Sequence, residues 1–123
     1  MQSNTPPDTR IYNIGVEATM DVIGGKWKPI ILCNLRHQKM RTSELKRAIP
    51  DITQKMLTQQ LRELEVDGII LRKVYNQVPP KVEYCLSDYG NSLGDLLDLL
   101  CSWGEKHVEV LQQNGRSVEL RCN

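Results

Sequence analysis

Apolar residues recur at helical spacing along the first part of the chain, and glycine or proline separates the segments. An apolar patch in residues 16–23 ends at Gly24-Gly25 and predicts a first helix. Residues 26–36 predict a second helix, because Pro29 is tolerated in a first turn and apolar residues follow it.

Two further helices are expected, joined by a tight connection. Residues 42–49 predict a third helix with Thr42 as its N-cap, and Pro50 ends it because the residue before a proline avoids the helical region. Residues 53–67 predict a fourth helix with Thr53 as its N-cap. Three leucines of this helix have the i, i+4, i+7 spacing of a core-facing stripe: Leu57, Leu61 and Leu64.

The pattern changes after Gly68, a residue suited to ending a helix in the left-handed conformation. Residues 69–75 predict a strand, residues 76–80 a turn with two prolines, and residues 81–86 a returning strand with alternating apolar positions. Together these segments predict an antiparallel hairpin.

A long helix is expected to follow the hairpin. Ser87 is a candidate N-cap, and residues 88–113 carry a helical apolar stripe that runs from Leu93 to Leu111. The whole order predicts a mainly α fold with a small antiparallel β-hairpin wing, which is a winged helix-turn-helix. We expect one such domain for DNA binding and dimerisation at residues 11–114, between a flexible N-terminal tail (1–10) and a C-terminal tail (115–123).

The fourth helix has the composition of a helix that enters the major groove. Amide, hydroxyl and basic side chains occupy its early turns, and acidic residues occur only late in it. Bases are contacted by the N-terminal part of such a helix, where amides bind adenine and cations bind guanine. A solvated helix face is the alternative. The candidate base-contacting residues are Thr53, Gln54, Lys55, Thr58, Gln59 and Arg62.

Basic residues flank the predicted turn of the hairpin, where they can lie along the phosphate backbone. They can also protect an edge strand from aggregation, and both roles are compatible. The candidate phosphate contacts are Arg41, Thr42 and Ser43 at the start of the third helix and Arg72, Lys73 and Lys81 in the wing.

Charge is distributed unevenly, although the net charge is only +1. Residues 41–81 hold eight basic and five acidic side chains, whereas residues 87–109 hold one basic and five acidic. A protein that binds DNA with one face and a second copy with another has such an asymmetry, but so does ordinary charge scatter. No apolar run is long enough to span a bilayer, and the N-terminus lacks the apolar core of a signal peptide, so we expect a cytoplasmic protein.

The sequence gives little evidence of an enzyme active site or a metal site. The two histidines are far apart, and neither a nucleophile elbow, a zinc-protease motif nor a glycine-rich phosphate loop is present. The four cysteines, Cys33, Cys85, Cys101 and Cys122, are widely spaced without a CxxC pair, which argues against a zinc site. We therefore expect no catalytic residues, no metal and no cofactor.

Three stretches carry a resemblance to a known family: VEATMDVIGGKWKPIIL (residues 16–32), RTSELKRAIPDITQKMLTQQLRELEVDGII (41–70) and VPPKVEYCLSDYG (78–90). The chain resembles the HxlR-type transcriptional regulators, a winged helix group related to the MarR type, over roughly residues 14–111. The resemblance implies a dimeric DNA-binding regulator of a bacterial or archaeal cytoplasm. It also implies that helix 53–67 enters the major groove and that hairpin 69–86 is the wing.

In this family the dimer is formed largely by the N-terminal helix and the long C-terminal helix, which agrees with the apolar stripe of the latter, since such a stripe needs a covering surface. The candidate dimerisation residues are Val16, Met20, Leu93, Leu96, Leu97, Leu100, Trp103 and Leu111. Packing of the two helices against each other within one chain is the alternative.

The chain departs from the resemblance at one position. Many relatives carry a cysteine just before the segment that matches residues 15–17, and some use it as a redox or electrophile sensor, but here Ile14 occupies the position. Sensing through that route is not expected, and analogy does not transfer it to another cysteine. Cys33 is expected to be a buried, inert thiol, and Cys122 to be the most exposed of the four.

We therefore expect a homodimer that binds double-stranded DNA at an inverted-repeat operator. The alternatives are a winged-helix module for protein interactions and a sensor that responds through a thiol or a ligand. An unidentified small-molecule effector is a further candidate partner. Tyr12, Trp27 and Trp103 could line a pocket for it, although such aromatic residues more often belong to a core.

Overall fold

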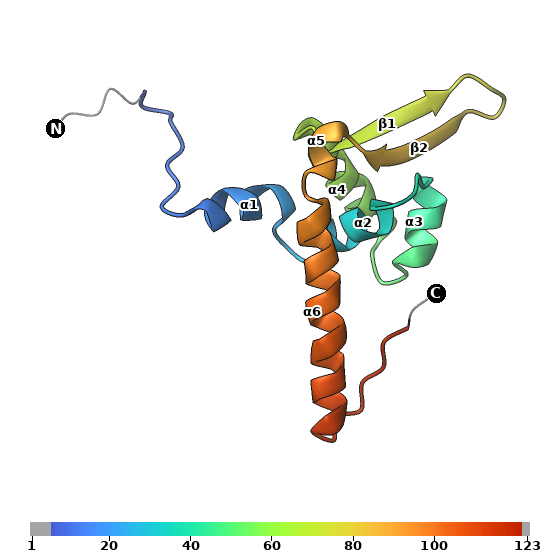
Figure 1. Cartoon of the computed structure of the whole chain (residues 1–123). Helices are drawn as coiled ribbons and strands as arrows, with labels where there is room; N and C mark the ends of the chain where they lie inside the picture. Colours follow the sequence, from blue (N-terminus) through green and yellow to red (C-terminus); the bar gives the residue numbers. More distant parts are fainter. Residues whose placement is uncertain (1–5, 122–123) are drawn as a thin grey trace.

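The computed structural model describes residues 6–121, which form six helices and one two-stranded sheet. Helices α1 (Gly15–Ile23), α2 (Trp27–Leu35), α3 (Thr42–Ala48) and α4 (Gln54–Val66) precede strands β1 (Ile70–Tyr75) and β2 (Lys81–Leu86), and α5 (Asp88–Asn91) and α6 (Gly94–Gln113) follow. Figure 1 shows α2, α3 and α4 gathered beneath the hairpin. From this body α6 extends as a long rod, and α1 lies on the far side of α6 from α3. The winged helix-turn-helix expected from the sequence is confirmed.

The core is built from leucine and isoleucine of the three central helices. Leu57, Leu61 and Leu64 of α4 are buried, as their spacing predicted, and pack with Leu32 of α2 and Leu45 of α3. Truncating one such buried leucine to alanine generally costs about 2–5 kcal/mol of stability. This packing fixes the side of α4 that faces inward, and it leaves the polar side in solvent.

Local signals set both ends of α4. The Thr53 hydroxyl accepts a hydrogen bond from the Met56 amide at 3.1 Å, which confirms the predicted N-cap. Gly68 has a φ of +75°, and the next amide, that of Ile69, reaches back to the Leu64 carbonyl at 3.0 Å. The helix is therefore held at a defined length and angle between the turn and the wing.

The hairpin pairs β1 with β2 in antiparallel register, from Ile70 opposite Leu86 to Tyr75 opposite Lys81. Met40 adds an isolated bridge to Tyr84, with hydrogen bonds of 3.0 and 2.8 Å in the two directions. This bridge joins the segment before α3 to the base of the wing, and the sequence pattern did not reveal it.

The prediction of one continuous helix over residues 88–113 is wrong. Ser87 does cap a helix, because its hydroxyl accepts from the Gly90 amide at 2.9 Å, but α5 ends after one turn and α6 begins at Gly94. Gly90 lies so close to the wing that a Cβ there would come within 2.0 Å of the Ile69 carbonyl oxygen. Helix α5 is thus packed tightly against the residue before β1, and glycine, a poor helix former, weakens the helix at the same place.

A second correction concerns the start of α3. Thr42 is the first helical residue rather than the cap, and Arg41 occupies the N-cap position. The Arg41 amide donates to the Glu44 carboxylate at 2.8 Å, so a side chain one turn into the helix satisfies this backbone group.

Candidate DNA-binding and dimer surfaces

The polar face of α4 is open to solvent along its first three turns. All five candidate residues within the helix are exposed: Gln54, Lys55, Thr58, Gln59 and Arg62. Gln54 donates to the Thr58 hydroxyl at 3.5 Å, the limit of a hydrogen bond, so both groups can exchange this contact for a base or phosphate. The structure therefore brings together, on one accessible face, the amide, hydroxyl and cationic groups that the sequence predicted for base contacts.

Electrostatics favour an anion at the N-terminal end of this face. The first turn of α4 holds no acidic residue, and the helix dipole adds partial positive charge there. Glu63, in the third turn, forms an ion pair with Lys28 of α2 at 3.6 Å. Asp67 lies at the far end of the helix. The carboxylates of α4 itself are thus kept away from the end that would approach phosphates.

The wing contributes cations of two kinds. Arg72 and Lys73 on β1 are exposed and extend into solvent. Lys81 on β2 is half-buried, because its ammonium lies 3.7 Å from the Glu83 carboxylate and 5.0 Å from the centre of the Tyr75 ring. Of the three predicted wing contacts, Lys81 is therefore the one that already has a partner.

Glu83 is a wing residue that the sequence analysis did not single out. A hydrogen bond with Tyr75 lowers the pKa of Glu83 most strongly, and the charges of Lys81, Lys39 and Arg41 lower it further. The same hydrogen bond raises the pKa of Tyr75. Lys39 and Arg41 come near Glu83 because the Met40 bridge joins their segment to β2. The alternation of apolar and polar residues in β2 did not indicate this group of charges around Glu83, because the group depends on a contact between distant segments.

The start of α3 lies below the hairpin (Figure 1). Arg41 and Ser43 are exposed there, and Thr42 is half-buried. Positive charge at a helix start next to a wing suits the phosphate backbone that flanks a groove.

A second, apolar surface lies on α6. Trp103 is 68% exposed and stacks on the His107 ring at 5.0 Å, and four further apolar side chains of α6 are exposed with it: Leu96, Leu99, Leu100 and Val110. Leu111 is half-buried. An apolar stripe of this kind is costly to leave in water.

One of the predicted dimerisation residues is buried within its own chain, and another is partly buried. Leu97 is 1% exposed and sits in the core of its own chain, and half-buried Leu93 packs against that core. Leu93 is the N-cap residue of α6 and lies about one helical turn before Leu97. Leu97 therefore has no surface to offer a second copy.

On α1, Val16 and Met20 are exposed, and Ile23 is its buried residue. Figure 1 shows α1 directed away from the length of α6. Packing of these helices within one chain therefore leaves uncovered both Val16 and the stripe around Trp103.

A hollow of about 480 Å³ lies between α1 and the α5–α6 junction. Tyr12 lines it and hydrogen-bonds Asp21, which also pairs with Arg10 at 2.8 Å. The other two aromatic residues proposed for a pocket are placed differently, since Trp27 packs against the core and Trp103 is on the exposed stripe of α6.

The chain is similar to known proteins in family, sequence and structure. The model of the HxlR-like helix-turn-helix family matches residues 22–112. The chain belongs to this family. An uncharacterised HTH-type transcriptional regulator, YtcD of Bacillus subtilis (strain 168), is 72% identical over 107 residues, which cover 87% of this chain and 85% of YtcD.

Solved structures agree with this assignment. A crystal structure of ytcD has a TM-score of 0.73 at 68% identity and covers 78% of this chain and 98% of its own. The redox regulator HypR in its oxidized form has a TM-score of 0.74 at 53% identity, with 76% and 96% covered. This HxlR-like chain is thus a transcriptional regulator with a helix-turn-helix DNA-binding fold and not an enzyme.

The cysteines of this HxlR-like regulator are not arranged as the sequence suggested. Cys33 is half-buried rather than buried, and its sulfur lies 3.5 Å from that of Cys101, which is exposed. Cys85 is half-buried in the wing, and Cys122 lies outside the described residues. Across residues 6–121, no group of three or more potential ligands could hold a metal ion. Within the same range no helix is long and apolar enough to cross a membrane.

Proposed function

We propose that this regulator acts as a homodimer in the cytoplasm and binds an inverted-repeat operator through two copies of α4. The observation that carries the proposal is the exposed face of α4, which combines amides and cations at its N-terminal end with acids kept at the other. Bidentate contacts from Gln59 and Arg62 to base edges would supply sequence specificity. The start of α3 and the wing, through Arg72 and Lys73, would hold the phosphates on either side.

The apolar stripe of α6 supports a second copy of the chain as its partner. It continues past the point where α6 leaves the body, so the chain's own core does not reach Trp103 or Val110. A twofold dimer through α6, with α1 covering its flank, would bury both exposed surfaces at once. It would also present the two α4 helices to successive major grooves, about 34 Å apart on one face of the duplex.

An unidentified small-molecule effector is a further proposed partner of the chain. We place this small molecule in the hollow between α1 and the α5–α6 junction. A ligand there would contact both α1 and the start of α6, the two helices of the proposed dimer surface. Such a ligand could change the angle between them and thereby the spacing of the two α4 helices.

The experiment that tests the proposed function is a fluorescence anisotropy titration of the full chain. The duplex is the DNA upstream of its own gene, a scrambled duplex serves as the control, and both are titrated over a range of salt concentrations. We expect tight, salt-sensitive binding that exceeds binding to the scramble, because phosphate contacts release counterions and base contacts add specificity.

Two matched variants locate the contact. Gln59→Ala should weaken operator binding by about 1–3 kcal/mol, the range of a good bidentate base contact, whereas Gln113→Ala at the end of α6 should leave it unchanged. Equal loss in both variants would contradict the assignment of α4. Absence of binding to either duplex at low salt would instead favour a winged helix used for protein contacts.

A further inference from the structure

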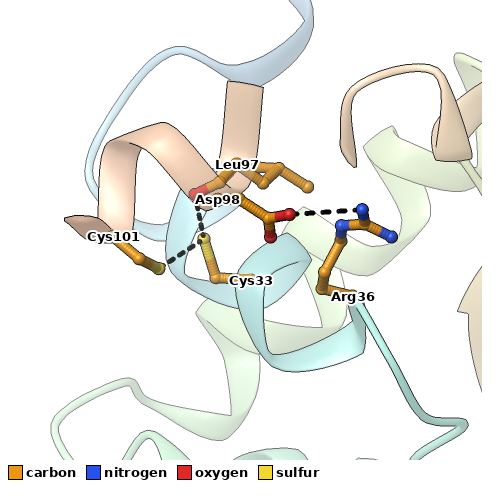
Figure 2. A network of polar contacts seen from close by, with 5 residues as sticks. All are labelled: Cys33, Arg36, Leu97, Asp98 and Cys101. Atoms are coloured by element: carbon orange, nitrogen blue, oxygen red, sulfur yellow. Dashed lines mark hydrogen bonds and ion pairs between the residues drawn. The ribbon is translucent and has the colours of Figure 1, made fainter. Parts of the chain in front are cut away.

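Two thiols from distant parts of the sequence meet between α2 and α6. The Cys101 thiol donates to the sulfur of Cys33 at 3.5 Å, although 68 residues separate them in sequence. Figure 2 shows the two side chains pointing toward each other across the helix pair. They are free thiols in this structure. The two reduced cysteines are therefore in direct sulfur–sulfur contact.

The surroundings hold the pair in place. Cys33 also donates to the Leu97 carbonyl at 3.8 Å, and one turn along α2 the Arg36 guanidinium binds the Asp98 carboxylate of α6 at 3.3 Å. A Cβ at Gly94 would come within 2.5 Å of that guanidinium, so a larger residue there would displace the Arg36 side chain from this position. Leu97, in the core, fixes this part of α6 against α2. The two sulfur atoms thus face each other across an ordered helix contact.

The pair is also accessible. An open hollow of about 210 Å³ is lined by both cysteines together with Arg36, His37 and Asp98. Cys101 is exposed in it and Cys33 is half-buried below. A molecule the size of a small peroxide can therefore reach Cys101 first.

We propose that Cys33 and Cys101 form a reversible thiol–disulfide site, which a small hydroperoxide oxidises to an intrachain disulfide that ties α2 to α6. The bond length of a disulfide is about 2.05 Å, so the two sulfur atoms must approach by roughly 1.5 Å. Small rotations of two cysteine side chains and a slight shift of α6 supply such a movement. The site differs from the position before Gly15, where this chain has Ile14.

Oxidation of the thiol pair by a hydroperoxide proceeds in two steps. The Cys101 thiolate attacks the peroxide, an S–O bond forms, the O–O bond breaks, and the alcohol or water that leaves takes up the proton lost by Cys101. The Cys33 sulfur then attacks the sulfenic acid, the S–S bond forms, the S–O bond breaks, and water leaves with the Cys33 proton. Two electrons pass from the sulfur pair to the peroxide, and a dithiol reductant returns two electrons and two protons.

Burial assigns the two roles. It raises the pKa of Cys33 to about 12, together with the hydrogen bond to Cys101 and the nearby charges of Cys101 and Asp98. Cys33 therefore stays protonated while Cys101 reacts. Once Cys101 is a neutral sulfenic acid, its charge no longer opposes ionisation of Cys33, and the second step can follow.

The cysteine pair lies between the candidate DNA-binding face of α4 and the apolar stripe of α6. Its role in regulation rests on the proposed function. Helix α2 packs against α4 and is joined to it by the Lys28–Glu63 ion pair, whereas α6 carries the proposed dimer stripe. A covalent link between α2 and α6 would shift one relative to the other. Oxidation is therefore expected to change operator affinity by about fivefold or more, the usual range of coupling between two sites.

The test begins with the full chain carrying Cys85→Ser and Cys122→Ser, which leaves only the pair. The reduced protein is treated with stoichiometric hydrogen peroxide, alkylated and digested without reductant, and its peptides are analysed by mass spectrometry. We expect a linked peptide containing Cys33 and Cys101 within one chain, and its loss after treatment with a dithiol. Two alkylated cysteines after oxidation, or a link between chains, would overturn the proposal.

Two controls guard against a misfolded variant. Cys33→Ser and Cys101→Ser should each abolish the intrachain link while the circular dichroism spectrum stays unchanged. On the unsubstituted chain, one equivalent of a monothiol-inert arsenical such as phenylarsine oxide should bridge the pair and protect both cysteines from alkylation. If the arsenical protects neither, the two thiols do not meet in solution and the site is wrong.

The final arm compares reduced and oxidised protein in the operator titration. A change of fivefold or more supports regulation by the disulfide, and equal affinities overturn the regulatory role. If the disulfide forms but neither state binds DNA, the proposed function fails while the thiol site stands.

Discussion

Helices α4 and α6 carry apolar stripes with the same helical spacing, but the stripes have different partners. In α4 the three leucines all enter the core of the chain, and the opposite face is polar. In α6 the stripe divides, because Leu97 enters the core while Trp103 and its neighbours stay exposed. Periodicity thus identifies the apolar side of a helix, but it does not show whether that side packs within the chain or against another molecule.

The largest effect should come from the core part of α6. Leu97→Ala should lower the free energy of unfolding by about 2–5 kcal/mol, because it leaves a cavity against α2. Urea unfolding followed by circular dichroism measures this change. The control Val66→Ala removes an exposed apolar side chain from α4 and should stay within about 0.5 kcal/mol. Similar losses in both variants would contradict the division of the α6 stripe.

The next effect concerns the exposed part of the same helix. Trp103→Glu should convert a dimer into a monomer, since truncation of a central interface tryptophan generally costs at least about 2 kcal/mol, and a buried charge adds to this. Sedimentation velocity gives the mass directly. Val66→Glu introduces the same charge at a side chain that is 80% exposed outside the stripe, and it should leave the dimer intact. A monomeric parent protein would refute the dimer.

The polar face of α4 should give a smaller effect, confined to specific binding. Arg62→Ala should weaken operator binding by about 1–3 kcal/mol without altering stability, because its guanidinium would bind one base pair. Arg116→Ala makes the same substitution in the C-terminal segment and serves as the control in the same anisotropy titration. A loss that is equal on operator and scrambled DNA would reassign Arg62 to the phosphate backbone.

The cap of α4 provides a test of local stability. Thr53→Ala should cost about 1 kcal/mol of folding free energy, because the Met56 amide loses its acceptor. Thr58→Ala removes a threonine from the exposed face of the same helix, where alanine is the better helix former, and should not destabilise. Thermal unfolding of the two variants separates the cap from the loss of a threonine as such.

The smallest effect is expected in the wing. Arg72→Ala should lower the slope of log affinity against log salt by about 1 on any DNA, as expected for one phosphate contact. Lys81→Ala should lower it by less, because Glu83 already holds that ammonium. Parallel salt titrations on scrambled duplex compare the two. A larger change for Lys81 would show that it leaves Glu83 when DNA binds.

Features that depend on interactions between residues close in sequence could be predicted, whereas features that depend on contacts between distant residues could not. The Thr53 cap, the Gly68 stop and the leucine spacing of α4 are local, and each was confirmed. The break between Asn91 and Gly94, by contrast, follows Gly90, whose backbone lies tight against the Ile69 carbonyl just before β1. The spacing of apolar residues along the chain does not indicate such a contact, so one long helix was predicted.

The same limit applies to the functional surfaces. The polar residues of α4 were correctly predicted to be exposed, because one face of a helix must face water when the opposite face packs in the core. The partner of Lys81 and the approach of Cys33 to Cys101 arise from residues that are distant or on separate helices. Neither has a sequence spacing that would identify it.

The most direct test of the central claim alters the DNA rather than the protein. Anisotropy titrations would compare the inverted-repeat operator with a duplex in which five base pairs are inserted between the half-sites. This insertion turns the second half-site by about half a helical turn, to the opposite face of the duplex. The proposed dimer predicts that affinity falls to that of a single half-site, whereas unchanged affinity would show that the two α4 helices do not bind DNA as a fixed pair.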